Sequence, residues 1–446
     1  MGAVGRLVVM GTGDVTNRYV IPALAELLAG GDLPDGFTVD LVSRHDVSDD
    51  ELAEMVNRAL DDRGDADDAT RDALLAMVGH HRADATDADA LAPVVGGDRP
   101  VAVYLALPAP VFPDAVGALA TVGLPAGSRV VFEKPFGTDL SSAVELNEKL
   151  RRCLPDDDVF RVDHFLGKQT VQLLLGIRFA NRVFEAAWSA EHVERVDIVW
   201  DETLALEGRA GFYDRAGALR DMIQNHLMQL FCLVAMEPPG SLEPDEVADR
   251  KIEVLDATRP FHADLACCST RARYTAGTVD GEQVVAYAES EGVDPERRTE
   301  TLASVTLGVD TDRWRGVPFT LRSGKALASD RHEVVVTFRS GSHPAADGAR
   351  NEVRVAVKPD RVGFELVVGE GSDALRTRPV DLVETLDDSP LGAYSVLLCD
   401  VIAGRSNRSV RAAEVEAAWR VLTPFLDAFA TDAIPLEDYP AGSHGP

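Results

Sequence analysis

Short apolar runs alternate with stretches of helical periodicity in the first third of the chain. This alternation of strand and helix predicts an α/β domain with a parallel, doubly wound sheet of the Rossmann type. The predicted strands are residues 7–10, 38–43, 101–107 and 130–132, and the predicted helices are 15–28, 49–60 and 113–122. The Asp- and Ala-rich interval 61–89 is interpreted as a pair of solvated helices. We expect this dinucleotide-binding domain to span residues 1–155.

The pattern changes after about residue 155, where β-type runs separated by turn residues dominate. They predict a mainly antiparallel sheet in a larger α+β domain over residues 156–434. The predicted strands are 195–200, 303–306, 319–322, 333–338, 352–357 and 362–367, and helical periodicity is strongest at 219–234, 394–403 and 414–428. The Pro-, Gly- and Ser-rich segment 435–446 is predicted to be a disordered tail.

Charge and cysteine content narrow the classes of function. The 446 residues include 44 basic and 74 acidic side chains, a formal charge of −30, which repels nucleic-acid phosphates and anionic lipid surfaces. The longest apolar runs are too short to cross a bilayer. The five cysteines are an odd number without metal-ligand spacing, so we expect reduced thiols and no metal site. No basic and apolar leader is recognised, so we expect a cytoplasmic protein. The negative charge and the short apolar runs lead us to expect no nucleic-acid or membrane partners.

A turn of small residues lies between the first predicted strand and the first predicted helix. Gly11, Thr12, Gly13 and Asp14 form this turn, where backbone amides can approach a pyrophosphate at the positive end of a helix. Simple tight packing between strand and helix explains the glycines equally well. The second strand is followed by Arg44, and an arginine there suits the 2′-phosphate of NADP, whereas NAD sites normally carry an acidic residue. The sequence therefore favours NADP over NAD, unless Arg44 is only a surface charge.

Several strings share their order and spacing with one enzyme family. They are Gly-Thr-Gly-Asp at 11–14, Glu-Lys-Pro-Phe-Gly-Thr at 133–138, Arg-Val-Asp-His-Phe-Leu-Gly-Lys at 161–168, Glu-Gly-Arg at 207–209, Arg-Asp-Met-Ile-Gln-Asn-His at 220–226 and Gly-Lys-Ala-Leu at 324–327. Together they resemble the glucose-6-phosphate dehydrogenase family, and matching strings run from about residue 7 to residue 430. The string at 161–168 is the most specific of them.

The resemblance implies an oxidoreductase that converts D-glucose 6-phosphate at C1 to 6-phosphoglucono-lactone, the entry step of the pentose phosphate pathway. Hydride would pass to the nicotinamide of NADP and the hydroxyl proton to His226. A histidine suits this role because its ordinary pKa lies near neutral pH. Asp163 would orient this base and stabilise its charged form. The family also implies a homodimer or a dimer of dimers.

Six further positions match substrate ligands of the family. His164 and Lys168 match ligands of the substrate phosphate, to which they would offer a hydrogen bond and a point charge. The residues that match sugar-hydroxyl ligands are Lys134, Glu202, Asp221 and Lys325, and Lys134 also stands where cofactor and substrate would meet. Without the resemblance to the family, Asp163 can equally be interpreted as a helix cap. His164 and Lys168 can then be a solvated pair on a helix.

Four positions depart from the family pattern. Met10 replaces the first glycine of the nucleotide fingerprint, Tyr19 stands where lysine is usual, Phe165 replaces a tyrosine, and Asp330 occupies the place of a second basic residue beyond Lys325. The same chemistry on a different sugar or sugar phosphate therefore stays open as an alternative. A catalytically silent paralogue is a weaker alternative, because such a scaffold has no need of a base and its orienting carboxylate.

Overall fold

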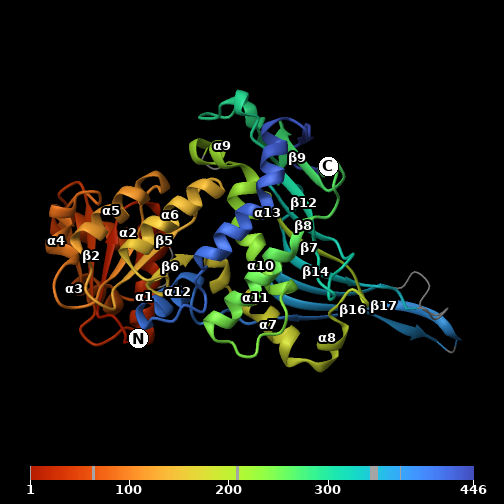
Figure 1. Cartoon of the computed structure of the whole chain (residues 1–446), viewed down its shortest axis with the longest axis horizontal. Coiled ribbons are helices and arrows are strands. Elements are labelled where there is room, and N and C mark those ends of the chain that lie inside the picture. The colour runs from red at the N-terminus through yellow and green to blue at the C-terminus, as the bar shows by residue number, and fades with distance from the viewer. Residues whose placement is uncertain (1, 63–65, 207–209, 342–349, 372) are drawn as a thin grey trace. The chain divides into compact units, whose positions relative to one another are not determined.

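The computed structural model of the chain describes residues 2–446 except 63–65, 207–209, 342–349 and 372. It divides into two compact units (Figure 1). Unit 1 comprises residues 1–168, 240–248 and 389–416, and unit 2 comprises residues 169–239, 249–388 and 417–446. Unit 1 extends beyond residue 155 and takes in two later segments, which the hydrophobic pattern along the chain does not group with it.

Unit 1 is built on a six-stranded parallel sheet in the order β3-β2-β1-β4-β5-β6. This order confirms the doubly wound fold: the first strand is central, and the order of the strands along the sheet reverses between β1 and β4. The strands are β1 (Arg6–Met10), β2 (Thr38–Ser43), β3 (Val78–Arg82), β4 (Ala102–Leu105), β5 (Arg129–Glu133) and β6 (Val159–Val162). The helices are η1 (Thr16–Val20), α1 (Ile21–Gly30), α2 (Asp49–Asp61), α3 (Asp68–Met77), α4 (Ala88–Val95), α5 (Phe112–Val122), α6 (Leu140–Cys153) and α12 (Ala393–Ala403), with short 3₁₀ turns η2 (Ala109–Val111), η3 (Asp156–Asp158) and η4 (His164–Gly167).

The interval 61–89 contains a strand, so its interpretation as a pair of helices is wrong. Helix α3 is followed directly by β3, which pairs in parallel with β2 at the edge of the sheet. The polar sequence Val-Gly-His-His-Arg of β3 hides the strand, because an edge strand that is only half buried needs no continuous apolar run.

Helix α12 is part of the core of unit 1 although it lies far along the chain. Leu398 and Val401 of α12 are buried in the same cluster as Leu7 and Val9 of β1. The buried guanidinium of Arg129 donates hydrogen bonds to the last carbonyl groups of α12, those of Val401 and Ile402. These contacts fix the end of α12, where a helix leaves carbonyl groups without partners inside the helix.

Unit 2 is built on a ten-stranded, mainly antiparallel sheet, as predicted. Its order is β17-β16-β15-β14-β7-β13-β12-β9-β18, with β8 paired to β12, and the pairs β7–β13 and β9–β18 are parallel. The strands are β7 (Val193–Asp201), β8 (Thr258–Pro260), β9 (Ser269–Thr275), β12 (Leu302–Val309), β13 (Phe319–Gly324), β14 (Arg331–Phe338), β15 (Asn351–Val357), β16 (Asp360–Glu370), β17 (Asp373–Thr385) and β18 (Leu436–Pro440). A separate hairpin joins β10 (Gly277–Val279) to β11 (Glu282–Val284).

Helices line the sheet of unit 2, as Figure 1 shows for α7 and α10. Contacts join α7 to β15 and β16, and α10 to β13. The helices are α7 (Gln169–Ala180), α8 (Arg182–Ala187), α9 (Ala210–Ala218), η5 (Leu219–Leu227) and α10 (Met228–Ala235), with 3₁₀ turns η6 (Leu265–Cys267), η7 (Tyr287–Glu289) and η8 (Pro295–Arg297). Helices α11 (Pro244–Ala257) and α13 (Ala412–Ala430) each begin in unit 1 and end in unit 2.

The predicted disordered tail is wrong, because β18 lies in the segment 435–446. Its residues pair in parallel with β9, and the ring of Tyr439 is buried. The Tyr439 hydroxyl donates to the carbonyl oxygen of Lys325 at 2.6 Å and shares a hydrogen bond of 2.9 Å with Thr301. Pairing with a distant strand supplies the order that local composition does not suggest.

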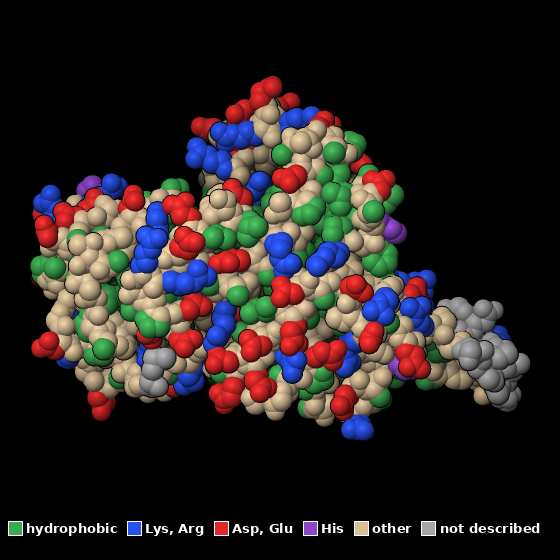
Figure 2. Space-filling view, viewed as in Figure 1, with side chains coloured by type: hydrophobic (Ala, Val, Ile, Leu, Met, Phe, Trp, Pro, Cys, Tyr) green, Lys and Arg blue, Asp and Glu red, His purple; other side chains and the backbone are tan. Residues whose placement is uncertain are grey.

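The excess of acidic residues is visible at the surface. On the face drawn in Figure 2, Asp and Glu side chains are spread widely, with Lys and Arg side chains between them. None of the described helices combines a membrane-spanning length with the apolar character that such a span needs.

Candidate active site

The carboxyl edge of the parallel sheet in unit 1 carries every candidate residue that the sequence places in this unit. The turn at residues 11–14 follows β1, Arg44 follows β2, Lys134 follows β5, and the segment 163–168 follows β6. Open α/β sheets bind ligands outside the carboxyl ends of their strands, at the point where the strand order reverses. The topology therefore brings the candidate cofactor and substrate residues of unit 1 to one edge.

The small-residue turn combines tight packing with open space. Gly11 has φ +112°, and a Cβ there would lie 2.4 Å from the carbonyl oxygen of Ala106, so this glycine is required by the backbone. A Cβ added at Gly13 would meet no heavy atom within 4 Å among the described residues. The hydroxyl of Thr16 donates to the carbonyl oxygen of Gly11 at 2.6 Å and closes the turn. The glycines thus fit both interpretations, and the open side at Gly13 suits a pyrophosphate.

A second basic residue accompanies Arg44 beyond the end of β2. Arg44 is exposed, and Arg82 at the end of β3 pairs in register with Ser43. Arg82 forms an exposed ion pair with Asp46 at 3.2 Å. The polar sequence of β3 predicts part of a helix, so it gives no sign that Arg82 lies beside the end of β2.

Lys134 follows a buried carboxyl group. Glu133 accepts a hydrogen bond of 2.6 Å from the hydroxyl of Tyr104 and a second from Tyr394. Burial raises the pKa of Glu133 to about 7, because the two tyrosine hydroxyls only partly offset the loss of solvation. The next peptide bond, Lys134–Pro135, is cis.

The segment after β6 is a capped 3₁₀ turn. Asp163 is buried, and its Oδ1 accepts a hydrogen bond of 2.9 Å from the backbone N–H of Phe165. The capping interpretation of Asp163 is therefore correct, and its role toward the base stays a prediction. Lys168 places Nζ 5.4 Å from the ring centroid of Phe165, and the His164 ring lies edge-on to the same ring at 5.1 Å. The two predicted phosphate ligands thus flank one buried aromatic ring.

The structure shows what two of the departures from the family do in unit 1. Met10 is the last residue of β1 and is fully buried, so it belongs to the sheet. Tyr19 lies in η1 and stacks on Tyr394 of α12, with 4.6 Å between ring centroids and 12° between planes. At position 19 an aromatic stacking contact therefore replaces the charge of the lysine that is usual in the family.

In unit 2, Glu202 and Lys325 meet at the ends of two neighbouring parallel strands. Asp201 of β7 pairs with Gly324 of β13, and the side chains of the following residues form an ion pair of 2.6 Å. Both side chains keep partial access to solvent. The Lys325 ammonium also lies 5.5 Å from the ring centroid of Tyr213, which the sequence analysis did not single out.

His226 and Asp221 lie on η5, a π-helical segment packed against β7, β12 and β13. His226 is almost fully buried and Asp221 is partly exposed. The sequence pattern predicts an ordinary α-helix over 219–234. The structure has a π-helix over Leu219–Leu227 instead. Single turns of this geometry occur frequently at functional sites. The structure thus brings both residues to an element packed on the strands that carry Glu202 and Lys325.

The start of η5 is held by a buried carboxyl group. Oε1 of Glu300 accepts a hydrogen bond of 3.1 Å from the N–H of Leu219, and burial raises the pKa of Glu300. Gly217 has φ +69°, and a Cβ there would lie 2.3 Å from Oε1 of Glu300. Only glycine lets this carboxyl group reach the helix start. No local signal marks Glu300, since it acts 81 positions away in the chain.

Asp330 has a structural role in place of the basic residue usual in the family. Its Oδ1 accepts hydrogen bonds from the N–H and the hydroxyl of Thr203, at 2.7 and 3.0 Å. Asp330 therefore fixes the residue after Glu202. The string Glu-Gly-Arg at 207–209 lies outside the described residues.

Comparison with known proteins finds relatives over the whole chain. A family model for the NAD-binding domain of glucose-6-phosphate dehydrogenase matches residues 8–173, and a model for its C-terminal domain matches residues 175–446. A glucose-6-phosphate 1-dehydrogenase of Gluconobacter oxydans (strain 621H) is 38% identical over 456 residues, which cover 98% of this chain and 93% of that protein.

Two solved structures share the fold of the whole chain. One, a glucose-6-phosphate dehydrogenase in complex with its substrate glucose-6-phosphate, has a TM-score of 0.90 at 30% identity and covers 100% of this chain and 96% of its own. The other, a glucose-6-phosphate 1-dehydrogenase from Mycobacterium avium, has a TM-score of 0.87 at 32% identity, with 100% and 95% covered.

Proposed function

Because the chain belongs to the glucose-6-phosphate dehydrogenase family, we propose that it oxidises D-glucose 6-phosphate at C1 to 6-phosphoglucono-lactone. The observation that carries the proposal is the candidate half-site of unit 2. It holds a buried histidine, His226, on an irregular helix packed against β7 and β13, the strands that are followed directly by Glu202 and Lys325. Oxidation of a hemiacetal requires a base that removes the hydroxyl proton, and polar groups that hold the sugar hydroxyls assist it.

The residues of the chain have distinct roles in this reaction. The imidazole of His226 accepts the proton of the C1 hydroxyl group as the C1–H bond breaks. The hydride that leaves C1 would pass to the nicotinamide of NADP when this cofactor is bound. Asp163 orients the imidazole and stabilises its charged form. Phosphate binding by His164 and Lys168 holds the sugar in place, and contacts to the remaining hydroxyl groups come from Lys134, Glu202, Asp221 and Lys325.

The ion pair of Glu202 and Lys325 prepares the sugar-binding half of the site. Each charge fixes the orientation of the other at 2.6 Å, so less conformational freedom remains to be lost when a sugar binds. Asp330 supports the same loop through Thr203. Its negative charge therefore has a local function that does not require a substrate other than glucose 6-phosphate.

NADP is the preferred cofactor in this proposal. The open side of the turn at Gly13 accommodates a pyrophosphate. The 2′-phosphate of NADP is a dianion that Arg44 and Arg82 can bind through charge-assisted hydrogen bonds.

A homodimer in the cytoplasm completes the proposal, with entry into the pentose phosphate pathway as its metabolic role. Leu366 and Val368 of β16 share a face of the sheet with Leu382 of β17, and these side chains are 42%, 39% and 53% exposed. A second copy of the chain would cover this apolar strip. Cys267 is exposed, and a surface thiol stays reduced in a compartment such as the cytoplasm. Light scattering on the wild type and on Leu382→Asp tests the dimer.

The enzyme assay measures reduced cofactor formed from glucose 6-phosphate, with NADP and with NAD. His226→Asn should lower kcat by roughly 10²–10⁴-fold with little change in KM, because the proton is removed chiefly in the transition state. Asp163→Asn should have a smaller effect. Near-normal turnover in His226→Asn would refute the assignment of the base, and a higher kcat/KM for another sugar phosphate would refute the substrate.

A further inference from the structure

Three aromatic rings in unit 1 form a continuous stack, here called the aromatic column. Tyr19 of η1 stacks on Tyr394 of α12 at 4.6 Å and 12°. The ring of His164 of η4 also stacks on Tyr394, at 5.7 Å and 14°. All three side chains are half-buried. A predicted phosphate ligand therefore forms one end of the column, and the residue that replaces the usual lysine forms the other.

Helix α12 is held close to the segment that carries His164. A Cβ added at Gly167 would lie 2.4 Å from the carbonyl oxygen of Ala393, the residue before Tyr394. This spacing leaves no room for a side chain, so glycine permits the contact. The first turn of α12 therefore cannot move toward η4, and the distance between Tyr394 and His164 is set by backbone packing.

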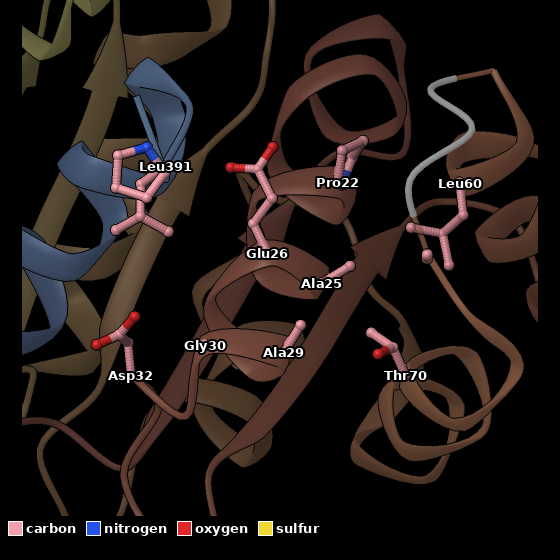
Figure 3. Close-up of a pocket in the computed structure, with 11 residues that line it drawn as sticks. Pro22, Ala25, Glu26, Ala29, Gly30, Asp32, Leu60, Thr70 and Leu391 are labelled. Atoms are coloured by element: carbon pink, nitrogen blue, oxygen red, sulfur yellow. The ribbon is translucent and has the colours of Figure 1, made fainter. Parts of the chain in front are cut away.

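The other side of α12 is tied to α1. Figure 3 shows the carboxylate of Glu26 directed toward the segment at Leu391, beside a cavity of about 430 Å³ that Pro22 and Ala25 also line. Glu26 accepts hydrogen bonds from the N–H of Gly392, at 2.8 Å, and from the hydroxyl of Ser395. The helix that follows Tyr19 thus holds the helix that carries Tyr394.

The hydroxyl group of Tyr394 adds a further restraint. It donates to the buried carboxyl group of Glu133, which also accepts from Tyr104. Tyr394 is therefore restrained through its hydroxyl at β5 and through its ring by Tyr19. A ring held in this way presents a fixed flat surface to the imidazole beside it.

We propose that Tyr19 and Tyr394 are positioning residues that fix the ring plane of His164 for binding of the substrate phosphate. The ring torsion of a histidine is broad when nothing packs against it. Stacking restricts the imidazole before substrate arrives, which lowers the ordering cost of binding. Tyr19 thus contributes orientation at a place where the family usually has a charge. This inference rests on the proposed function, because it assumes that His164 binds the phosphate.

The test compares Tyr19→Leu with Tyr19→Phe. Tyr19→Phe keeps the stack and should behave as the wild type. Tyr19→Leu should raise the KM for glucose 6-phosphate about 3- to 10-fold, the loss that corresponds to one aromatic pair. Its kcat and its KM for NADP should stay within about twofold of the wild type, because the column restrains a ground-state ligand. Phe184→Leu removes a similar stacked ring, at 5.4 Å from Phe364, and should change none of these values.

A direct measurement separates this inference from the proposed function. Calorimetry with glucose 6-phosphate should show the same 3- to 10-fold weakening of Kd in Tyr19→Leu without any turnover. If Tyr19→Leu does not fold, Tyr19→Met gives the same comparison with more volume retained. A wild type that neither binds nor oxidises glucose 6-phosphate overturns the function and this inference together. A wild type that does both, with Tyr19→Leu unchanged or Tyr19→Phe equally impaired, overturns only the inference.

Discussion

Replacing Glu133 by glutamine should change how the stability of the protein depends on pH. In the folded protein the pKa of Glu133 is raised to about 7 by burial, whereas the ordinary value is 4.5. Between these values the folded state keeps a proton that the unfolded state releases. The free energy of unfolding contributed by this group is therefore complete below about pH 4.5 and declines as pH rises toward 7.

The size of this decline follows from the same two values. A difference of this size corresponds to a loss on the order of 3 kcal/mol across the interval. Glutamine stays neutral and keeps an oxygen that can accept from Tyr104 and Tyr394. Glu133→Gln should therefore lack the decline and should be relatively more stable above about pH 7.

Denaturant unfolding at several pH values from about 5 to 8 measures this difference. Glu145→Gln, which removes an exposed carboxylate paired with Lys149, is the matched control and should keep the wild-type slope. Parallel curves for Glu133→Gln and the wild type would show that Glu133 ionises in its ordinary range. Burial would then not raise the pKa of this carboxyl group.

Three further predictions concern other parts of the site. Arg44→Ala should raise the KM for NADP about tenfold or more, because a charge-assisted contact worth roughly 1.5–3 kcal/mol is lost. Arg82→Ala should change the KM in the same direction. Equal losses with NAD would show that these arginines are structural. Gly217→Ala should destabilise the protein by about 1–3 kcal/mol and lower kcat, because the new Cβ displaces Glu300 and the start of η5; an unchanged melting temperature contradicts this. Phe165→Tyr should improve kcat/KM for glucose 6-phosphate by at most roughly 1.5–3 kcal/mol, and a flat or lower value would indicate a pocket shaped for another substrate.

The parts of the fold that the sequence predicts are those with strong local signals. Strands β1 and β5 contain apolar runs that are buried on both faces, and such runs are recognisable without knowledge of their neighbours. The turn at Gly11 is recognisable because the backbone requires glycine there. Once the parallel strands are predicted, the candidate residues that follow them are expected at one edge of the sheet, because the carboxyl ends of parallel strands lie at the same edge.

The parts that were missed depend on partners far away in the chain. Strand β3 is polar, so Arg82 was hidden in a predicted helix. Glu300 reaches the start of η5 from another part of unit 2, and Tyr394 comes beside His164 only through the packing of α12. Local pattern carries no information about such contacts, because the partners are brought together only by the fold.

Because β18 lies far downstream of Lys325, the loop that carries Lys325 is completed only after the residues of β18 have been synthesised. Lys325 is translated 114 positions before Tyr439, whose hydroxyl binds its carbonyl oxygen. The neighbouring Ala328 likewise donates to the carbonyl oxygen of Ser443. While the residues of β18 are still inside the ribosome, the loop at Lys325 therefore lacks these two hydrogen bonds. Oxidising activity should emerge only after β18 has joined the sheet, and a proteolytic cut before Leu436 should abolish it again.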